Sequence, residues 1–266
     1  TAPMVLGQPE ALIWCVVSWT VVVLRLISRR MRLGGWRRLQ LEDAVAVLAV
    51  LSASALMVVL DGVQTYWPAP GPLTSYKWTP QFVRNRTLGQ KLRITTEELL
   101  LVSVWTTKAG LLLMYHQLTE LTNQRKQVLF TAVYVAVSFV VLELALTVGW
   151  CRPFSEYWAM IPENKECRVY TNYYIMLIAF NVSTDLLILI IPLPLLRSRK
   201  VGIRRSWRTK LIILAILALG VFTITCSVVS KIFFLQKLRS LETLSWYTRE
   251  AFTAILCANL SRCMPV

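Results

Sequence analysis

Two polar side chains interrupt an apolar run, Tyr173 to Leu196, that is long enough to cross a bilayer. Asn181 and Asp185 lie four residues apart in this run, so a helix places them on one face. A carboxylate at that depth is costly in hydrocarbon, and such groups usually face the protein interior and pair with another group. The spacing therefore predicts a polar site inside a membrane-spanning bundle, where Asp185 needs a partner.

Lys108 is the candidate partner. At about 1.5 Å of rise per residue, Lys108 lies about 15 Å from Glu98, close to the middle of its own apolar segment. Asp185 lies about 18 Å from Tyr173, at a similar depth. One interpretation is an ion pair that fixes the packing of two helices. The other makes one of the two groups a proton donor or a ligand contact.

Two further carboxyl groups lie within apolar segments. Glu143 has no basic residue near it in its own segment, and Glu250 stands one turn inside the last one. A carboxyl group in such surroundings tends to stay protonated and could act as a Brønsted acid. Glu143, Asp185 and Glu250 are therefore the predicted catalytic acids. Charged residues at the outer segment ends could converge with them on an outward-facing cavity: Asp61, Glu97, Glu98 and Lys231.

Aromatic residues gather at the same outer level. They form either an interfacial belt or a lining that stabilises a cationic intermediate or ligand. They are Trp150, Trp158, Tyr170, Tyr173, Tyr174, Trp246 and Tyr247. The residues predicted to contact a substrate combine part of this set with the mid-span polar groups. They are Trp105, Lys108, Asn181, Tyr174, Trp246 and Tyr247.

The elements that must position these residues are membrane-spanning helices. The chain is 56% hydrophobic with a mean hydropathy of +0.54, which exceeds what a soluble domain needs. We predict one all-α domain, a seven-helix transmembrane bundle. Its spans cover about residues 11–28, 41–60, 95–118, 128–150, 173–196, 209–235 and 246–260. The net charge of +15 fits the positive-inside rule, so contact with membrane lipids is expected and nucleic acid binding is not.

The basic loops fix the predicted orientation. Arginine and lysine crowd the loops after the first and fifth spans and, more weakly, the turn after the third, so these should be cytosolic. The amino terminus is then outside and the carboxyl end inside. Asn85 begins a glycosylation sequon in an outer loop, and Cys151 and Cys167 flank another, where a disulfide can persist. Cysteine and histidine show no metal-ligand spacing, and no cofactor is expected.

Four stretches together resemble the fungal integral membrane proteins that have a rhodopsin-like domain. They are WTTKAGLLLMYHQL (Trp105–Leu118), GWCRPFSEYW (Gly149–Trp158), AFNVSTDLLILIIPLPLL (Ala179–Leu196) and Glu250 with AILCANL (Ala254–Leu260). The resemblance covers nearly the whole chain and implies seven helices. It departs at Ser261, where proline would follow Asn-Leu, and the last span lacks a lysine for a retinal Schiff base. The family's members include receptor-like proteins and proteins encoded in secondary-metabolite clusters.

Two functions remain open on this basis. The first is a membrane-embedded enzyme of fungal secondary metabolism that cyclises or isomerises a lipophilic prenylated, terpenoid or polyketide substrate by acid catalysis. The second is a G-protein-coupled-receptor-like sensor of a small lipophilic ligand, although Met114–Glu120 lacks an acidic-Arg-aromatic triplet. Either protein would reside in the endoplasmic reticulum or the plasma membrane.

Overall fold

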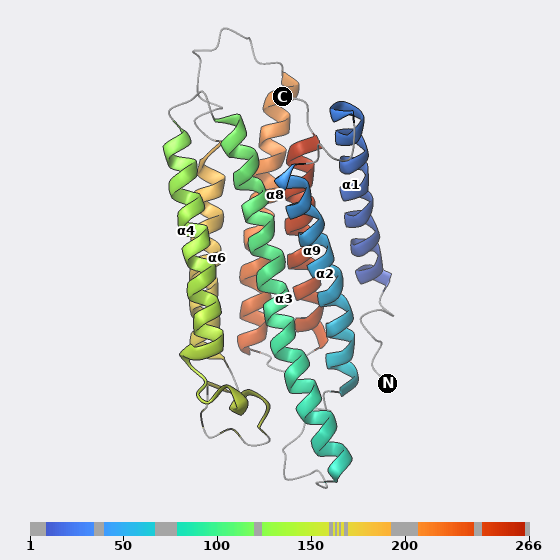
Figure 1. Ribbon diagram of the computed structural model, residues 1–266, viewed down its shortest axis with the longest axis vertical. Helices are drawn as coiled ribbons and strands as arrows, with labels where there is room; N and C mark the ends of the chain where they lie inside the picture. The colour runs from blue at the N-terminus through green and yellow to red at the C-terminus, as the bar shows by residue number, and fades with distance from the viewer. Residues whose placement is uncertain are drawn as a thin grey trace.

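The computed structural model is an elongated bundle of helices (Figure 1). It describes residues 9–34, 40–66, 79–119, 124–159, 162, 164, 166–167, 170–192, 207–236 and 241–263. Within these residues, seven α-helices account for most of the chain. They are α1 (Pro9–Leu33), α2 (Leu41–Tyr66), α3 (Pro80–Leu118), α4 (Arg125–Leu144), α6 (Thr171–Ile190), α8 (Trp207–Gln236) and α9 (Leu241–Cys263). The prediction of an all-α membrane bundle is confirmed.

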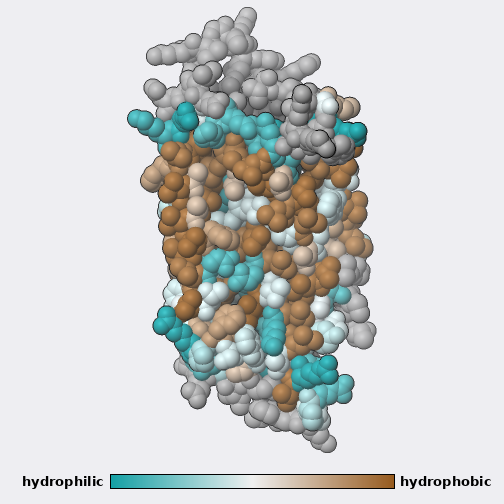
Figure 2. Space-filling view, viewed as in Figure 1, coloured by the Kyte–Doolittle hydropathy of each residue, from teal (hydrophilic) through white to brown (hydrophobic). Residues whose placement is uncertain are grey.

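Several of these helices are built to cross a membrane. Five described segments are long and apolar enough to do so: α1, α2, α3, α6, and α4 together with the π-helical turn η4 (Ala145–Gly149) that continues it. In α8 the corresponding described apolar stretch is shorter, Gly220–Ile232. Figure 2 shows a broad apolar band across the visible face of the bundle, with hydrophilic residues towards its ends. This is the surface that a protein embedded in lipid requires.

The packing of α4 illustrates how the band arises. Its buried residues recur every three or four positions, which puts them on one face of the helix. They are Val128, Thr131, Val135, Ser138 and Leu142. Large apolar side chains such as Phe130 and Val133 lie on the other face and are exposed. A soluble helix would carry polar groups there, so this face is suited to acyl chains.

Helix α3 lies in the middle of the bundle. It packs against α2, α4, α6 and α9, while α1 packs against α2 and α9, and α8 fills the space between α6 and α9. Side chains from α3 therefore meet those of most other helices. Because successive helices run in opposite directions, the connections alternate between two ends of the bundle (Figure 1). We call them the disulfide end, which carries Cys151–Cys167, and the Gln40 end.

The start of α3 differs from the predicted boundary. The helix begins at Pro80 rather than near Thr95, and its first turns project past the rest of the bundle (Figure 1). Thr79 caps this end by accepting a hydrogen bond from the backbone N–H of Phe82 at 3.3 Å. The sequence analysis placed this stretch in an outer loop, whereas Pro80 begins the helix, because proline is favourable in a first helical turn. The exposed Asn85 is therefore on a helix rather than in a loop.

A compact cap follows η4 at the disulfide end. The predicted bridge between Cys151 and Cys167 is present. The short 3₁₀ helix η5 (Phe154–Trp158) lies between the two cysteines, and its Tyr157 hydroxyl donates to the carbonyl of Leu146 at 2.8 Å. Burial raises the pKa of this phenol, so it remains a donor across the physiological pH range.

The cap also contacts α3. Arg93 stacks on the ring of Tyr170 at 4.4 Å, and Lys91 stacks on Trp158 at 5.2 Å. Tyr170 precedes α6 with a φ of 54°, a left-handed conformation that is uncommon for a tyrosine. Burial also raises the pKa of Tyr170, an effect that Arg93 opposes. The projecting end of α3 thus helps to hold the start of α6 in place.

Two predicted regions lie partly outside the described residues. The fifth span was expected to reach Leu196, but α6 ends at Ile190 and residues 193–206 are not described. Most of the basic loop after that span falls in this gap. The orientation of the bundle in the membrane stays a prediction.

Candidate functional site: a polar network across the bundle

The predicted partnership of Lys108 and Asp185 is present. The Nζ of Lys108 on α3 lies 2.9 Å from Oδ1 of Asp185 on α6. The same ammonium donates to the Thr184 hydroxyl at 2.7 Å, to the backbone carbonyl of Asn181 at 3.0 Å, and to the Asn181 side-chain oxygen. It also stands 4.7 Å from the ring centre of Trp105. Helix α6 supplies these acceptors within a single turn, because residues 181, 184 and 185 share a face.

A second buried ion pair joins α8 and α9. The Nζ of Lys231 lies 3.1 Å from Oε2 of Glu250, and the Ser230 hydroxyl donates to the same oxygen at 2.7 Å. Lys231 is 1% exposed and stacks on the ring of Tyr247 at 4.7 Å. The sequence analysis placed Lys231 at a helix end; the structure puts it against Glu250. A buried carboxylate held by an ammonium and a hydroxyl is stabilised in its ionised form.

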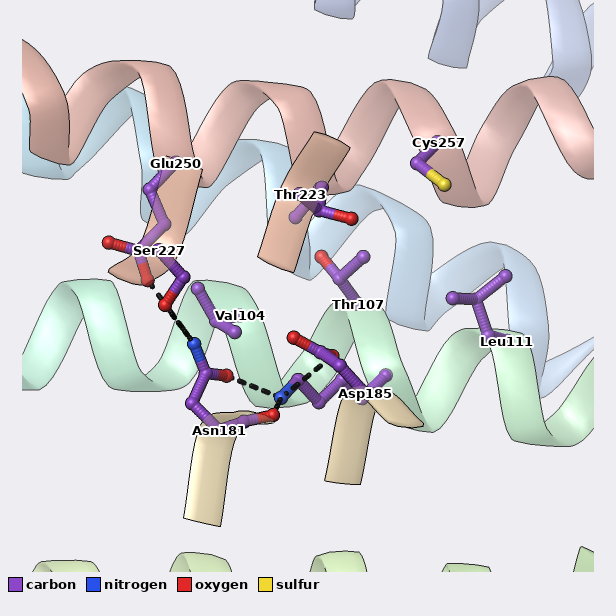
Figure 3. Close-up of a pocket in the computed structure, with 11 residues that line it drawn as sticks. Val104, Thr107, Leu111, Asn181, Asp185, Thr223, Ser227, Glu250 and Cys257 are labelled. Carbon is purple, nitrogen blue, oxygen red and sulfur yellow. Dashed lines mark hydrogen bonds and ion pairs between the residues drawn. The ribbon is translucent and has the colours of Figure 1, made fainter. Parts of the chain in front are cut away.

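Asn181 connects the two ion pairs. Its side-chain oxygen accepts from Lys108, and its amide nitrogen donates to Ser227 and, at 3.4 Å, to Oε1 of Glu250. The residue is 3% exposed and lies at the junction of α3, α6, α8 and α9 (Figure 3). The result is one polar network that holds two cations and two carboxylates. We call the set Lys108, Asn181, Asp185, Lys231 and Glu250 the central network.

Glu97 adds a further polar layer towards the disulfide end. Its Oε1 accepts from the hydroxyls of Tyr174 at 2.5 Å and Tyr247 at 2.8 Å. The two phenolic oxygens are 3.3 Å apart. A cavity of about 10 Å³ lies between Glu97 and the central network and is lined by Lys231 and Glu250, among others. This volume is about that of one water molecule, so water can connect the two layers.

A larger cavity borders the central network. It has a volume of about 40 Å³ and is lined by residues of α3, α6, α8 and α9 (Figure 3). They include Thr107, Lys108, Asn181, Asp185, Thr223, Ser227, Glu250 and Cys257. The space holds about three water molecules. It is far below the 300–1,000 Å³ that is typical of a pocket enclosing a small organic ligand.

Polar contacts continue to the Gln40 end. A cavity of about 10 Å³ lies between Thr107 and the Arg25–Asn259 pair. Arg25 on α1 donates to the Asn259 side-chain oxygen of α9 at 2.9 Å and to Asp43 of α2 at 3.1 Å. Arg29 forms further ion pairs with Asp43 at 3.0 Å and with Glu42 of α2 at 2.9 Å. These contacts fix α1 and α9 to the start of α2.

The structure separates Glu143 from the other predicted acids. Glu143 projects from α4, and its carboxyl group lies within hydrogen-bonding reach of Glu98 on α3. Two carboxyl groups can share a hydrogen bond only if one of them carries a proton. Tyr173 lies buried beside this pair. Among the described residues, Glu97 and Glu250 thus lie together, whereas Glu98 and Glu143 form a separate pair. The convergence of all these acids, Asp61 included, on one outward-facing cavity stays a prediction.

Trp246 also lies away from the central network. It lines a groove of about 320 Å³ between α1, α8 and α9, together with Trp14, Phe222 and Val229. Its ring stacks on Arg249 at 4.7 Å, and Arg249 forms an ion pair with Glu10 at 2.6 Å. The predicted substrate contacts thus divide, with Trp105, Lys108, Asn181, Tyr174 and Tyr247 gathered at the bundle centre.

Sequence reasoning missed the hydroxyl groups that complete the network. Thr184, Ser227 and Ser230 supply a donor or acceptor to Lys108, Asn181 and Glu250 respectively, and such residues are common in any apolar helix. One signal was available, since Ser227 lies one helical turn before Lys231. Among the described residues, one acid and cysteine group has metal-ligand proximity, Cys151, Glu156 and Cys167, but both of its sulfur atoms are in the disulfide.

Comparison with known proteins supports the resemblance noted from the motifs. Searches of curated proteins and of solved structures each found no match. The sequence model of the fungal rhodopsin domain, in contrast, matches residues 24–266, which include every member of the central network. This chain therefore belongs to the fungal rhodopsin domain family.

Proposed function

We propose that this protein is a seven-helix membrane sensor of a small lipophilic molecule. The observation that carries the proposal is the central network, in which Asn181 links the Lys108–Asp185 and Lys231–Glu250 ion pairs at the junction of four helices. A sensor needs an element with two arrangements that a ligand can bias.

The network is a poor choice for stability alone. Burying two ion pairs removes four charges from water, and a well-packed apolar core of the same volume is often as stable or more stable. Each ion pair also joins two different helices, α3 with α6 and α8 with α9. Separating either pair would leave charges uncompensated, so intermediate positions are unfavourable. Such a network favours discrete helix arrangements over gradual deformation.

The small size of the cavity argues against an enzyme at this location. The 40 Å³ cavity cannot enclose a terpenoid or polyketide substrate. Asp185 and Glu250 each accept a lysine ammonium, which suits a carboxylate rather than a proton donor. A small change at the cavity would instead shift ion-pair geometry, and the helices would transmit that shift to the Gln40 end through Asn259 and Arg25.

The test is ligand-dependent signalling by the purified protein in lipid nanodiscs. Lipophilic prenylated and polyketide compounds would be screened for nucleotide exchange on a fungal G-protein heterotrimer, which is the partner that this function implies. We expect Asn181→Leu to abolish the response, because it removes the bridge and leaves both ion pairs unconnected. Tyr134→Phe, which removes a hydroxyl contact with Ser183 outside the network, is the control. A full response from Asn181→Leu would refute the proposal.

One observation favours a second function, an acid-catalysed cyclase or isomerase of a lipophilic substrate. Glu98 and Glu143 lie within hydrogen-bonding reach of each other, and among the described residues neither forms an ion pair with a lysine or arginine. A proton shared by the two carboxyl groups could therefore serve as the Brønsted acid. The catalytic acid would then be Glu143, with Glu98 as its hydrogen-bonding partner, rather than Asp185 or Glu250.

Turnover measurements discriminate between the two functions. Candidate prenylated and polyketide substrates would be incubated with the wild type and with Glu143→Gln, Asp185→Asn and Glu250→Gln. An enzyme that uses the carboxyl pair loses product formation in Glu143→Gln, by about 10²-fold or more for loss of a general acid. Equal turnover in all three variants would exclude acid catalysis by these groups. Residence in the endoplasmic reticulum would accord with the enzyme, and residence in the plasma membrane with the sensor.

A further inference from the structure

The central network reaches the molecular surface at Asp185. The Asp185 side chain is 20% exposed, whereas that of Lys108, its partner, is 5% exposed. Asn181 and Glu250 are buried as well. Figure 2 shows hydrophilic residues interrupting the apolar band near its middle. A carboxylate is therefore partly accessible at a depth where the surrounding medium is acyl chain rather than water.

One oxygen of this carboxylate is without a hydrogen bond. Oδ1 accepts from Lys108 at 2.9 Å, and within the described part of the chain Oδ2 has no hydrogen-bonding partner. A carboxylate oxygen that faces hydrocarbon is unfavourable by several kcal/mol in general. A donor from outside the protein would remove that penalty. The exposed side of Asp185 is thus a binding position for a group that arrives through the bilayer.

The helices around Asp185 limit what can enter. One turn further along α6, Leu189 meets Gly220 of α8, where an added methyl group would lie 2.6 Å from Leu189 Cδ1. Glycine allows the two helices to approach there, and this contact closes the Gln40 side of the opening. Inside, Thr223 and Cys257 line the 40 Å³ cavity behind Asp185 (Figure 3). The opening is therefore lateral, narrow and shallow.

We propose that this lateral opening binds the hydroxyl group of a neutral lipophilic alcohol, which donates to Oδ2 of Asp185. The cavity accommodates a hydroxyl and its first carbons, so the remaining hydrocarbon lies in the bilayer against apolar residues of α6 such as Leu186, which is exposed. The proposal extends the sensor function by naming its ligand class. Binding of the alcohol does not depend on the sensor function; only the signalling that follows from binding does. It defines the ligand class and its route of entry.

Charge determines the preference for a neutral group. An amine would be protonated, and its charge would be left uncompensated in the bilayer, because the Asp185 carboxylate is already paired with the Lys108 ammonium. A carboxylic acid in its ionised form would be repelled by Asp185 itself. An alkane has no donor and leaves Oδ2 unpaired. An alcohol satisfies the oxygen without adding charge to a network that is already balanced by two cations and two carboxylates.

Photo-cross-linking measures this binding directly. The protein in nanodiscs would be irradiated with dodecanol that carries a diazirine beside its hydroxyl, and the labelled peptides would be identified by mass spectrometry. We expect labelling on α6 and α8 around Asp185 and Thr223. Unlabelled dodecanol should compete about tenfold better than dodecane, dodecylamine or dodecanoic acid, the value of one hydrogen bond to a charged acceptor.

Two matched variants of α8 make the result specific. Thr223→Leu fills the cavity without altering either ion pair and should reduce labelling about tenfold. Thr225 lines the groove around Trp246 on another side of α8, so Thr225→Leu should leave the labelling unchanged. Equal competition by all four compounds, or labelling confined to the groove around Trp246, would overturn the proposal. If the alcohol does not bind but another ligand still activates the G protein, this site is rejected and the sensor function stands. If the alcohol binds without activating the G protein, the sensor function is rejected and the site stands.

Discussion

The bundle carries acidic side chains within its apolar helices in two regions and pairs them in two ways. In the central network, Asp185 and Glu250 each contact a lysine. Nearer the disulfide end, Glu98 and Glu143 lie within hydrogen-bonding reach of each other, an arrangement that two carboxyl groups share only when one of them carries a proton. The first arrangement pairs each acid with a cation, whereas the second pairs two acids.

This difference separates two kinds of chemistry within one apolar bundle. An ion pair resists proton transfer but responds to any shift in the distance between its partners, which suits a conformational switch. Two carboxyl groups that share a proton carry less net charge than two carboxylates, and they can donate that proton to a substrate, which suits acid catalysis.

The largest effect is expected for Lys108→Met. The change leaves Asp185 buried without its cation, and loss of one partner of a buried ion pair typically costs about 3–5 kcal/mol. Thermal unfolding in nanodiscs would measure the loss. The double variant Lys108→Met with Asp185→Leu should recover most of it, because no charge is then left unpaired. A single variant as stable as the wild type would show that the pair is solvated.

Removal of the disulfide should have the next largest effect. Cys151 and Cys167 are 16 residues apart, and closing a loop of that size contributes about 3 kcal/mol. The double Cys→Ser variant should unfold at a lower temperature and lose order first in the cap and at the start of α6, which hydrogen exchange would detect. If amides around the central network lost as much protection from hydrogen exchange as those of the cap, the cap and the central network would not be independent.

Thr79→Ala provides a reference outside both regions. The substitution removes the hydroxyl that caps α3 and should cost about 1 kcal/mol. Because the capped turns project beyond the bundle, the effect should appear as faster hydrogen exchange at residues 80–93 alone. Faster exchange in the bundle interior would mean that the projecting helix also supports the network.

The smallest effect at neutral pH is expected for Glu143→Gln. The glutamine amide can donate to Glu98 as the protonated carboxyl does, so stability should change by about 0.5 kcal/mol or less. Thermal unfolding of the variant and of the wild type in nanodiscs would measure the difference. A loss of about 3 kcal/mol or more, as for a broken buried ion pair, would show that Glu143 has an ionic partner instead.

Much of the architecture followed from the sequence. Hydropathy and segment length predicted the helical membrane bundle, and the depth of Lys108 and Asp185 predicted their ion pair, because two opposite charges at one level of a bilayer have few other partners. The cysteines at consecutive segment ends predicted the disulfide. These conclusions depend on local composition and on distance along a helix axis.

What the sequence left open was the direction in which each side chain points around its helix. Glu143 and Glu250 are alike as acids in apolar segments, yet one meets Glu98 and the other meets Lys231. That outcome depends on the rotation and crossing of helices far apart in the chain, set by contacts such as that of Gly220 with Leu189. Depth in the membrane could be counted from the sequence, whereas the pairing of charges at a given depth was decided by tertiary packing alone.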